Sequence, residues 1–137
     1  MRHTTEIELA NLSDLNLADR GVITPEEVRR VTIEDALVDT GATRLCLPKP
    51  IIEQLGLTPY GNAKARTAAG IVDRIIYSTV EFTVLERKGT LPVTDLPPDA
   101  PVLVGHMVLE QLDLCLDIRK GLIYNPDHGD DWIEDAW

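Results

Sequence analysis

The stretch Ala36-Leu37-Val38-Asp39-Thr40-Gly41-Ala42-Thr43 carries the most information about the fold and the chemistry. An apolar run of strand-forming residues ends in a carboxylate, and a hydroxyl and a glycine follow it. In this setting the acid lies in a low dielectric, the hydroxyl can fix the backbone, and the glycine lets another group approach closely. A strand that simply ends in a turn looks the same, so the rest of the chain must decide between the two interpretations.

The length and the charge narrow the class of protein. A chain of 137 residues has room for one domain with a buried core. Its net charge of −10 is the wrong sign for binding nucleic acid or an anionic membrane. We expect one domain over residues 1–125 and an acidic tail over 126–137, which carries five acids, no Lys or Arg, and Trp132 and Trp137.

The sequence also predicts the location of the protein, the redox state of its cysteines and whether it needs a metal or cofactor. No apolar run approaches the roughly 20 residues that span a bilayer, and the first residues do not resemble a signal peptide, so we expect a cytoplasmic location. Cys46 and Cys115 each lie between leucines, as small buried hydrophobes do, and we expect both to be reduced. The three histidines have no ligand spacing, so we predict neither a metal nor a cofactor.

Apolar and polar residues alternate with a period of two along most of the chain. This predicts an all-β protein, mostly strands with one or two short helices. Residues 6–9 and 31–34 each have one face fit for burial, and we expect them to pair. Residues 75–85 and 90–93 predict a hairpin with its turn at 87–89.

Two short segments carry helix signals. Thr24-Pro25-Glu26-Glu27 combines a cap, a first-turn proline and a capping-box glutamate, so residues 11–30 predict a turn or short helix. A second short helix is predicted from Pro50 to Leu55, stopped by Gly56.

From residue 95 onward, the simple alternation of apolar and polar residues no longer holds. Residues 95–101 hold three prolines and predict a loop. A buried strand at 102–105 then runs into a short helix at 108–112. Residues 114–118 and 122–124 predict a final hairpin.

Two motifs in the expected order give the chain a resemblance to a known family. Leu37 to Ala42 resembles the catalytic loop of the single-lobe, retropepsin-like aspartic proteases of bacterial type, which are related to the retroviral proteases. Val102-Leu103-Val104-Gly105, followed by the helix at 108–112, resembles the second signature of that family. The resemblance covers about residues 5–125 and implies a closed β-barrel of the acid protease fold, with one lobe per chain.

The same resemblance assigns roles to individual residues. It implies that Asp39 is catalytic and that Thr40, Gly41 and Ala42 support the loop, with Thr40 bracing it across a dimer. Residues 63–76 take the place of the flap that closes over substrate, and its apex consists of Ala68, Ala69 and Gly70. Gly105 belongs to the second signature. Apart from these, generic aliphatic residues are expected to line the substrate pocket, namely Ile71, Val72 and Val102.

Elementary chemistry explains why one such aspartate is not enough. Hydrolysis of an amide by carboxylates needs a general base and a general acid at the same moment. Two close carboxylates meet this need because they share one proton, as the paired aspartates of pepsin do. The chain holds a single Asp-Thr-Gly, so we predict an aspartic endopeptidase that acts as a homodimer on an extended peptide, with Asp39 from each copy.

Some residues depart from the retroviral pattern, and another function stays open. His106 stands where that pattern has an arginine, the chain continues beyond Leu116, and Ala42 offers the dyad no hydroxyl, which favours activity nearer neutral pH. The alternative is a catalytically silent retropepsin-like module that dimerises or binds peptides.

Overall fold

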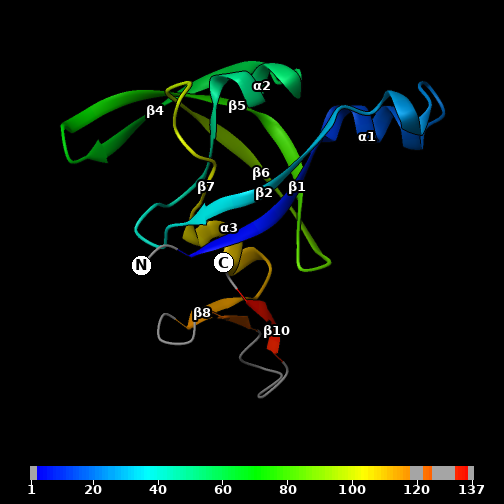
Figure 1. The fold of residues 1–137 in the computed structure, drawn as a ribbon. Helices are drawn as coiled ribbons and strands as arrows, with labels where there is room; N and C mark the ends of the chain where they lie inside the picture. The colour runs from blue at the N-terminus through cyan, green and yellow to red at the C-terminus, as the bar shows by residue number, and fades with distance from the viewer. Residues whose placement is uncertain (1–2, 118–121, 125–131, 136–137) are drawn as a thin grey trace.

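The computed structural model describes residues 3–117, 122–124 and 132–135 (Figure 1). Over these residues the chain is mostly β, with three short α-helices and one turn of 3-10 helix. The strands form a seven-stranded sheet and a separate three-stranded sheet. The predicted all-β class with short helices is confirmed.

The large sheet closes on itself into a barrel. Its strands lie in the order β1-β2-β7-β3-β6-β5-β4, and β1 pairs a second time with β5. That pairing closes six strands and leaves β4 attached only to β5. The strands are β1 (Thr4–Asn11), β2 (Arg30–Val38), β3 (Leu45–Pro48), β4 (Pro59–Thr67), β5 (Gly70–Val84), β6 (Arg87–Leu96) and β7 (Leu103–Val104).

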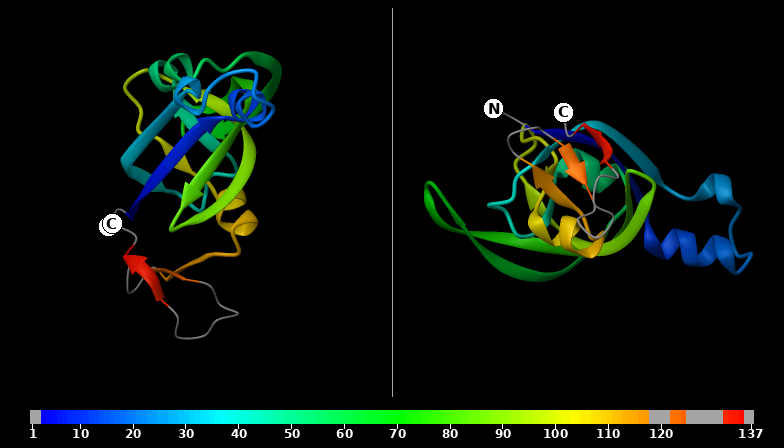
Figure 2. Two further views of the ribbon diagram at one scale, coloured as in Figure 1. Left: turned by 90° about the vertical axis from the view of Figure 1, so that its right-hand side faces the viewer. Right: turned by 90° about the horizontal axis from the view of Figure 1, so that it is seen from below.

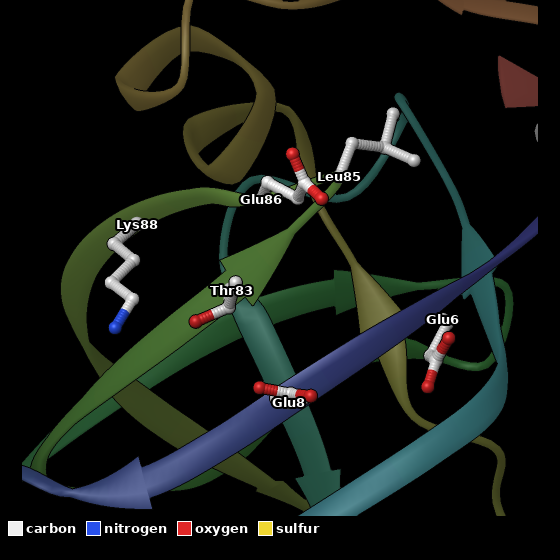
Figure 3. Close-up of a pocket in the computed structure, with 6 residues that line it drawn as sticks. All are labelled: Glu6, Glu8, Thr83, Leu85, Glu86 and Lys88. Carbon is white, nitrogen blue, oxygen red and sulfur yellow. The ribbon is translucent and has the colours of Figure 1, made fainter. Parts of the chain in front are cut away.

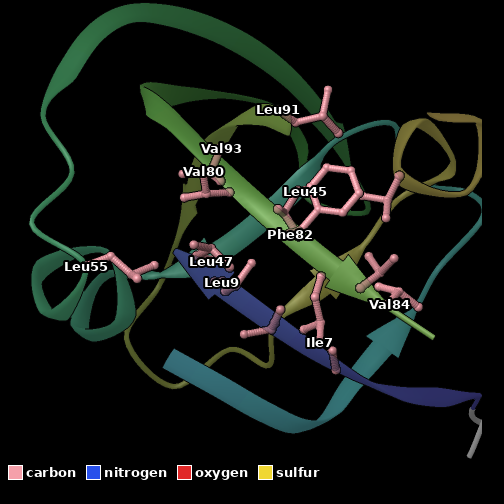
Figure 4. Packing of buried hydrophobic residues seen from close by; sticks show 14 of the residues in the cluster. Ile7, Leu9, Leu45, Leu47, Leu55, Val80, Phe82, Val84, Leu91 and Val93 are labelled. Carbon is pink, nitrogen blue, oxygen red and sulfur yellow. The ribbon is translucent and has the colours of Figure 1, made fainter. Parts of the chain in front are cut away.

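Aliphatic side chains fill the barrel (Figure 4). β1 and β2 pair antiparallel, with Ile7 opposite Ile33 and Leu9 opposite Val31, which confirms the first predicted pairing. Ile7, Leu9 and Phe82 are at most 1% exposed. Phe82 is the chain's single phenylalanine, so packing depends mainly on Leu, Ile and Val.

The helices are short and lie at the ends of strands. They are α1 (Leu12–Asp19), the 3-10 turn η1 (Pro25–Glu27), α2 (Lys49–Gln54) and α3 (His106–Gln111). The capping box of Thr24 and Glu27 is present at η1, and α2 matches the predicted second helix. Helix α3 starts two residues before the predicted 108–112.

Residues 12–29 leave the barrel between β1 and β2 and return to the same point, away from the β4–β5 hairpin (Figure 2). The Asn11 amide N–H donates to the Arg29 carbonyl at 3.0 Å, so the two ends of the excursion are joined. The buried Asn11 side chain caps α1 by accepting from the Asp14 N–H and donates to the Leu55 carbonyl. Asp14 accepts two hydrogen bonds from the Arg29 guanidinium, which hold the pKa of Asp14 below its ordinary value.

The β5–β6 hairpin turns two residues earlier than predicted. Its turn is Leu85–Glu86, both with positive φ, and β6 already begins at Arg87, so the turn predicted at 87–89 is wrong. Strand β6 runs to Leu96 and contains Pro92. Proline has no N–H to donate within a sheet, and Pro92 is tolerated because it lies where the register between β6 and β5 shifts. The predicted proline loop therefore starts later than residue 95.

A three-stranded sheet follows α3. It contains β8 (Cys115–Asp117), β9 (Leu122–Tyr124) and β10 (Trp132–Asp135), in the order β10-β9-β8. The first two form the predicted final hairpin, although its turn at 118–121 lies outside the described residues. Strand β10 pairs antiparallel with β9, so part of the segment predicted as an acidic tail has strand structure. Trp137 lies outside the described residues.

Helices of the described residues are too short and too polar to cross a bilayer.

Candidate active site

The loop that holds Asp39 lies where three strands meet. Strand β2 ends at Val38 and pairs parallel with β7, which in turn pairs antiparallel with β3. The Asp39 N–H donates to the Val104 carbonyl at 3.0 Å, so β7 supports the loop directly after β2 ends. The Ala42 N–H donates to the Asp39 carbonyl at 3.0 Å and closes a tight turn. Asp39 is therefore held between the ends of two adjacent strands.

Helix α3 fixes the other side of this loop. The N–H groups of Gly105, His106 and Met107 donate to the carbonyls of Arg44, Ala42 and Thr43 at 3.1, 2.9 and 3.0 Å. The first N–H groups of a helix have no partner within the helix, and here the loop supplies acceptors for them. The second motif thus supports the first.

Gly105 permits this close approach. A Cβ at position 105 would lie 2.7 Å from the Thr43 carbonyl carbon and 2.8 Å from the Ala42 oxygen, and closer still to the Arg44 oxygen. No larger residue fits without moving the backbone of the loop. Gly105 is a support for the loop.

The Asp39 carboxylate has a defined orientation. Its Oδ1 accepts a hydrogen bond from the Gly41 N–H at 3.0 Å, and the side chain is half-buried. A Cβ at Gly41 would lie 3.2 Å from the same oxygen, so even alanine would press on the carboxylate. Thr40 is exposed, and its hydroxyl has no hydrogen-bond partner among the described residues.

A row of outward-facing residues leads from Asp39 across the sheet. Strand register places Leu37 beside Leu103, Leu103 beside Cys46, Cys46 beside Thr94, and Thr94 beside Ile76. Neighbours in register share one face of a sheet, and Leu37 shares that face with Asp39 by alternation. Except for the buried Thr94, these side chains are half-buried. We call them the outer row: Asp39, Leu37, Leu103, Cys46, Thr94 and Ile76.

The thiol of Cys46 lies in the middle of the outer row. Cys46 is free, and its Sγ lies 3.1 Å from the Thr94 hydroxyl. Burial raises the pKa of this thiol, and the charge of Asp39 adds to the rise, while the Thr94 hydrogen bond and the charges of Arg74 and Arg44 oppose it. The side chain of Cys46 is half-buried and faces outward, so it is less buried than its place between two leucines indicated.

The β4–β5 hairpin extends past the barrel on the same side as the Asp39 loop (Figures 1 and 2). Ala68 and Ala69 form its two-residue tip, and Gly70 starts β5 with a φ of +111°. The Thr67 hydroxyl donates to the Gly70 carbonyl and accepts from the Ala69 N–H, which fixes the tip. The hairpin predicted for this segment is present.

The two faces of the hairpin differ in exposure. One face is half-buried throughout and continues the outer row through Ile76; its other members are Gly61, Ala63, Ala65, Val72 and Arg74. The opposite face is exposed at Asn62, Lys64, Arg66, Ile71 and Asp73. We call the first of these the inner face and the second the outer face.

Three of the predicted pocket residues can now be placed. Val72 lies on the inner face, as expected. The prediction for Ile71 is wrong, because its side chain is 63% exposed on the outer face. The prediction for Val102 is also wrong, because its side chain is 5% exposed and packs in the core. Sequence reasoning missed Leu37, Leu103 and Cys46, although their alternation with buried neighbours was a signal for an outward face.

A separate hollow of about 410 Å³ has a lining that does not include Asp39 (Figure 3). It lies between β1 and the β5–β6 turn and is lined by Glu6, Glu8, Thr83, Leu85, Glu86 and Lys88. Among the described residues, no group of three or more acids, histidines or cysteines could hold a metal ion, so these glutamates do not form a metal centre. The chemistry of the protein is better sought at Asp39, which the two motifs jointly hold.

The chain is similar in fold to a solved structure. The structure is similar to that of EIAV protease complexed with the inhibitor HBY-793, with a TM-score of 0.58 and 16% identity over 86% of this chain and 94% of that one. It also matches the solution structure of the protease of simian foamy virus (mac), with a TM-score of 0.47 and 20% identity over 80% of this chain and 92% of that one. No family model and no curated protein matches the sequence.

The first of these likenesses establishes the fold. The chain has the closed barrel of a retroviral protease, which confirms the predicted retropepsin-like fold. At this identity the likeness does not extend to the activity.

Proposed function

We propose that the protein is an aspartic endopeptidase in which Asp39 from two copies forms one active site. The observation that carries the proposal is the Asp39-Thr40-Gly41 loop, whose carboxylate is oriented by the Gly41 N–H in the fold of a retroviral protease. In addition, Gly105 and α3 hold the loop rigidly. Rigid placement of reacting groups is what catalysis requires.

The reaction needs a second carboxylate beside Asp39. One carboxylate deprotonates a water molecule while the other, protonated, donates to the carbonyl oxygen of the scissile peptide bond. The sequence holds one Asp-Thr-Gly, so a second copy of the chain supplies the partner. Exposed Thr40 is available to brace the two loops against each other.

The substrate is an extended peptide. It would lie along the outer row, with the inner face of the β4–β5 hairpin over it and Ala68, Ala69 and Gly70 at the closing tip. Extended peptides bind by adding a strand, since backbone hydrogen bonds hold them and alternate side chains enter subsites. Half-buried aliphatic side chains of the outer row suit such subsites.

The decisive experiment compares peptide cleavage by the wild type and Asp39→Asn across pH 3 to 8. The variant removes the acid while keeping the size of the side chain, so we expect cleavage to fall by roughly 1,000-fold, as loss of a general acid or base does. A statine-type inhibitor should block the wild type. Asp35→Asn is the matched control, because Asp35 is exposed on the same strand and should retain full activity.

Two results would contradict the proposal. Equal cleavage by the wild type and Asp39→Asn would assign the activity to a contaminant. No cleavage of any peptide by a chain that sedimentation shows to be dimeric would favour the silent, peptide-binding module instead.

A further inference from the structure

Two arginines flank the outer row. Arg74 lies on the inner face of the hairpin, opposite Ala63 on β4 and two residues before Ile76 on β5. Arg44 directly precedes β3, where Leu45 and Leu47 are fully buried, so by alternation it shares the outward face of Cys46. Both side chains are half-buried. The charges of both arginines, and that of Asp39, act on the Cys46 thiol, which is consistent with this placement.

Neither guanidinium is neutralised by a carboxylate of the described residues. Among the described residues, ion pairs involve Arg29, Lys64, Lys88 and His106, and neither Arg44 nor Arg74 has an ion-pair or hydrogen-bond partner for its side chain. Most Lys and Arg side chains of the described residues lack an ion pair, but the others without a partner are exposed, whereas Arg44 and Arg74 are half-buried. A half-buried guanidinium without a carboxylate has lost part of its hydration and gained no partner in exchange.

We infer that Arg74, with Arg44, makes the outer row and the inner face of the hairpin select peptides that carry Asp or Glu within a few residues of the scissile bond. The inference rests on the proposed function, because it names the substrate class of that same surface. It follows from the placement of two cations, both without a partner among the described residues, beside an outer row that starts at Asp39 and is mainly aliphatic. The register partner of Arg74 is Ala63, whose side chain is one methyl group, and Gly61 two residues before it has no side chain, so neither carries a bulky group in front of the guanidinium.

A carboxylate is the ligand that matches these cations. Arginine presents a planar fork of donors that binds a carboxylate through two hydrogen bonds, and such charge-assisted bonds are stronger than neutral ones. In an extended peptide, alternate side chains point to the same side, so a Glu or Asp reaches Arg74 while its neighbours keep their backbone contacts with the hairpin.

The test uses the full chain and a library of peptides from a digested proteome, with cleavage sites read by mass spectrometry. We expect acidic residues to be enriched at one or two positions beside the cleaved bond. Synthetic versions of one cleaved peptide, with Glu, Gln or Lys at that position, then give the preference. We expect kcat/KM to be about 10-fold higher for Glu than for Gln, which is the size of one charge-assisted hydrogen bond.

Substitutions on the two faces of one hairpin separate this role from a general effect of charge. Arg74→Gln should reduce the preference to about 1, and Arg74→Glu should reverse it in favour of Lys. Arg66→Gln is the matched control, because Arg66 lies exposed on the outer face and should leave the preference intact.

Three outcomes would overturn the inference while leaving the proposed function in place. They are cleavage without enrichment of acids, the same loss of preference in Arg66→Gln and Arg74→Gln, and a lower sedimentation mass of Arg74→Gln, which would assign the arginine to contacts between copies.

A binding measurement separates failure of this inference from failure of the proposed function. Asp39→Asn protein is titrated with fluorescein-labelled peptides of alternating Val-Glu or alternating Val-Gln, followed by anisotropy. If no peptide is cleaved by the wild type, tighter binding of the Val-Glu peptide that Arg74→Gln abolishes still supports recognition of acidic peptides by Arg74, and equal binding of the two peptides overturns it.

Discussion

Strand β5 belongs to two hairpins that differ in almost every respect. Its first part pairs with β4 and extends off the barrel, with its outer face exposed at Ile71 and Asp73. Its second part pairs with β6 and contributes Val80, Phe82 and Val84, all 0% exposed. One continuous strand thus belongs to the projecting hairpin at one end and to the core at the other.

The two hairpins are also anchored differently. At the β5–β6 hairpin, the Arg87 guanidinium donates to the Leu112 carbonyl at 3.0 Å and the Thr90 N–H donates to the Gln111 side chain, so both bonds tie it to the end of α3. The β4–β5 hairpin has one ion pair between its own described residues, Lys64 and Asp73, and both side chains are largely exposed. The difference indicates that stability resides in the second part of β5, and that the first part is free to serve binding.

The largest expected effect is on the core half. Phe82→Ala should lower the free energy of unfolding by about 3–5 kcal/mol, because it removes a fully buried ring and leaves a cavity. Ile71→Ala, on the other half of the same strand, should change it by no more than about 0.5 kcal/mol. Urea denaturation measures both values, and comparable losses would mean that the hairpin is part of the folded core.

Shortening the β4–β5 hairpin should have the opposite pattern of effects, with a large loss of activity and a small change in stability. Lys64 and Asp73 are register partners, so joining them through Asn-Gly in place of residues 65–72 should keep the register. We expect the thermal midpoint to change little and peptide kcat/KM to fall about 100-fold, or about 2.7 kcal/mol in transition-state stabilisation. Retained cleavage would show that the hairpin does not contact substrate.

The turn of the anchored hairpin stores strain that one substitution can release. Glu86 is exposed and has a φ of +67°, which suits glycine better than a residue with a side chain. Glu86→Gly should raise the free energy of unfolding by about 0.5–1 kcal/mol, measured by urea denaturation. A decrease would mean that the Glu86 side chain contributes more than its backbone costs.

The smallest effect is expected for the ion pair of the free hairpin. Lys64 lowers the pKa of Asp73 below its ordinary value, so any stabilisation from the pair is present above the ordinary pKa and is lost as the pH falls through the lowered one. Because both groups are exposed, Lys64→Ala should leave the unfolding free energy unchanged at pH 7. Titration by NMR should nevertheless show the Asp73 pKa moving up to its ordinary value, and a measurable loss of stability would contradict the comparison.

Local signals predicted part of this structure well. The alternation in β1 and β2, the capping box at Thr24 and the proline and glycine that bound α2 act over a few residues, and each appears as predicted. Turn 85–86 was misplaced because neither of its residues is the glycine that positive φ favours. Helix α1 was not separated from its loop because Leu12, Leu15 and Leu17 are only half-buried and form no clear apolar stripe.

Long-range pairing explains what else was missed. Strand β3 has four residues and is identified by its partners β6 and β7, which lie far along the chain. Asp39 and Gly105 could be named because each lies in a compact motif. Arg44 and Arg74 lie beside the same outer row only because of the register of several strands, and a single sequence does not contain that register.

The excursion of residues 12–29 has a practical consequence. Its two ends are hydrogen-bonded to each other, and the side chains of Asn11, Asp14 and Arg29 add further hydrogen bonds there. The stability of the barrel therefore depends on the closure of this loop more than on its length. Each doubling of such a loop costs only about 0.6 kcal/mol in closure entropy. Val22 is exposed in this excursion, which projects from the barrel on the side away from the β4–β5 hairpin (Figure 1). It is therefore a suitable place to attach a fluorophore or insert a tag, and a pair of differently labelled chains would report assembly without a change at Asp39.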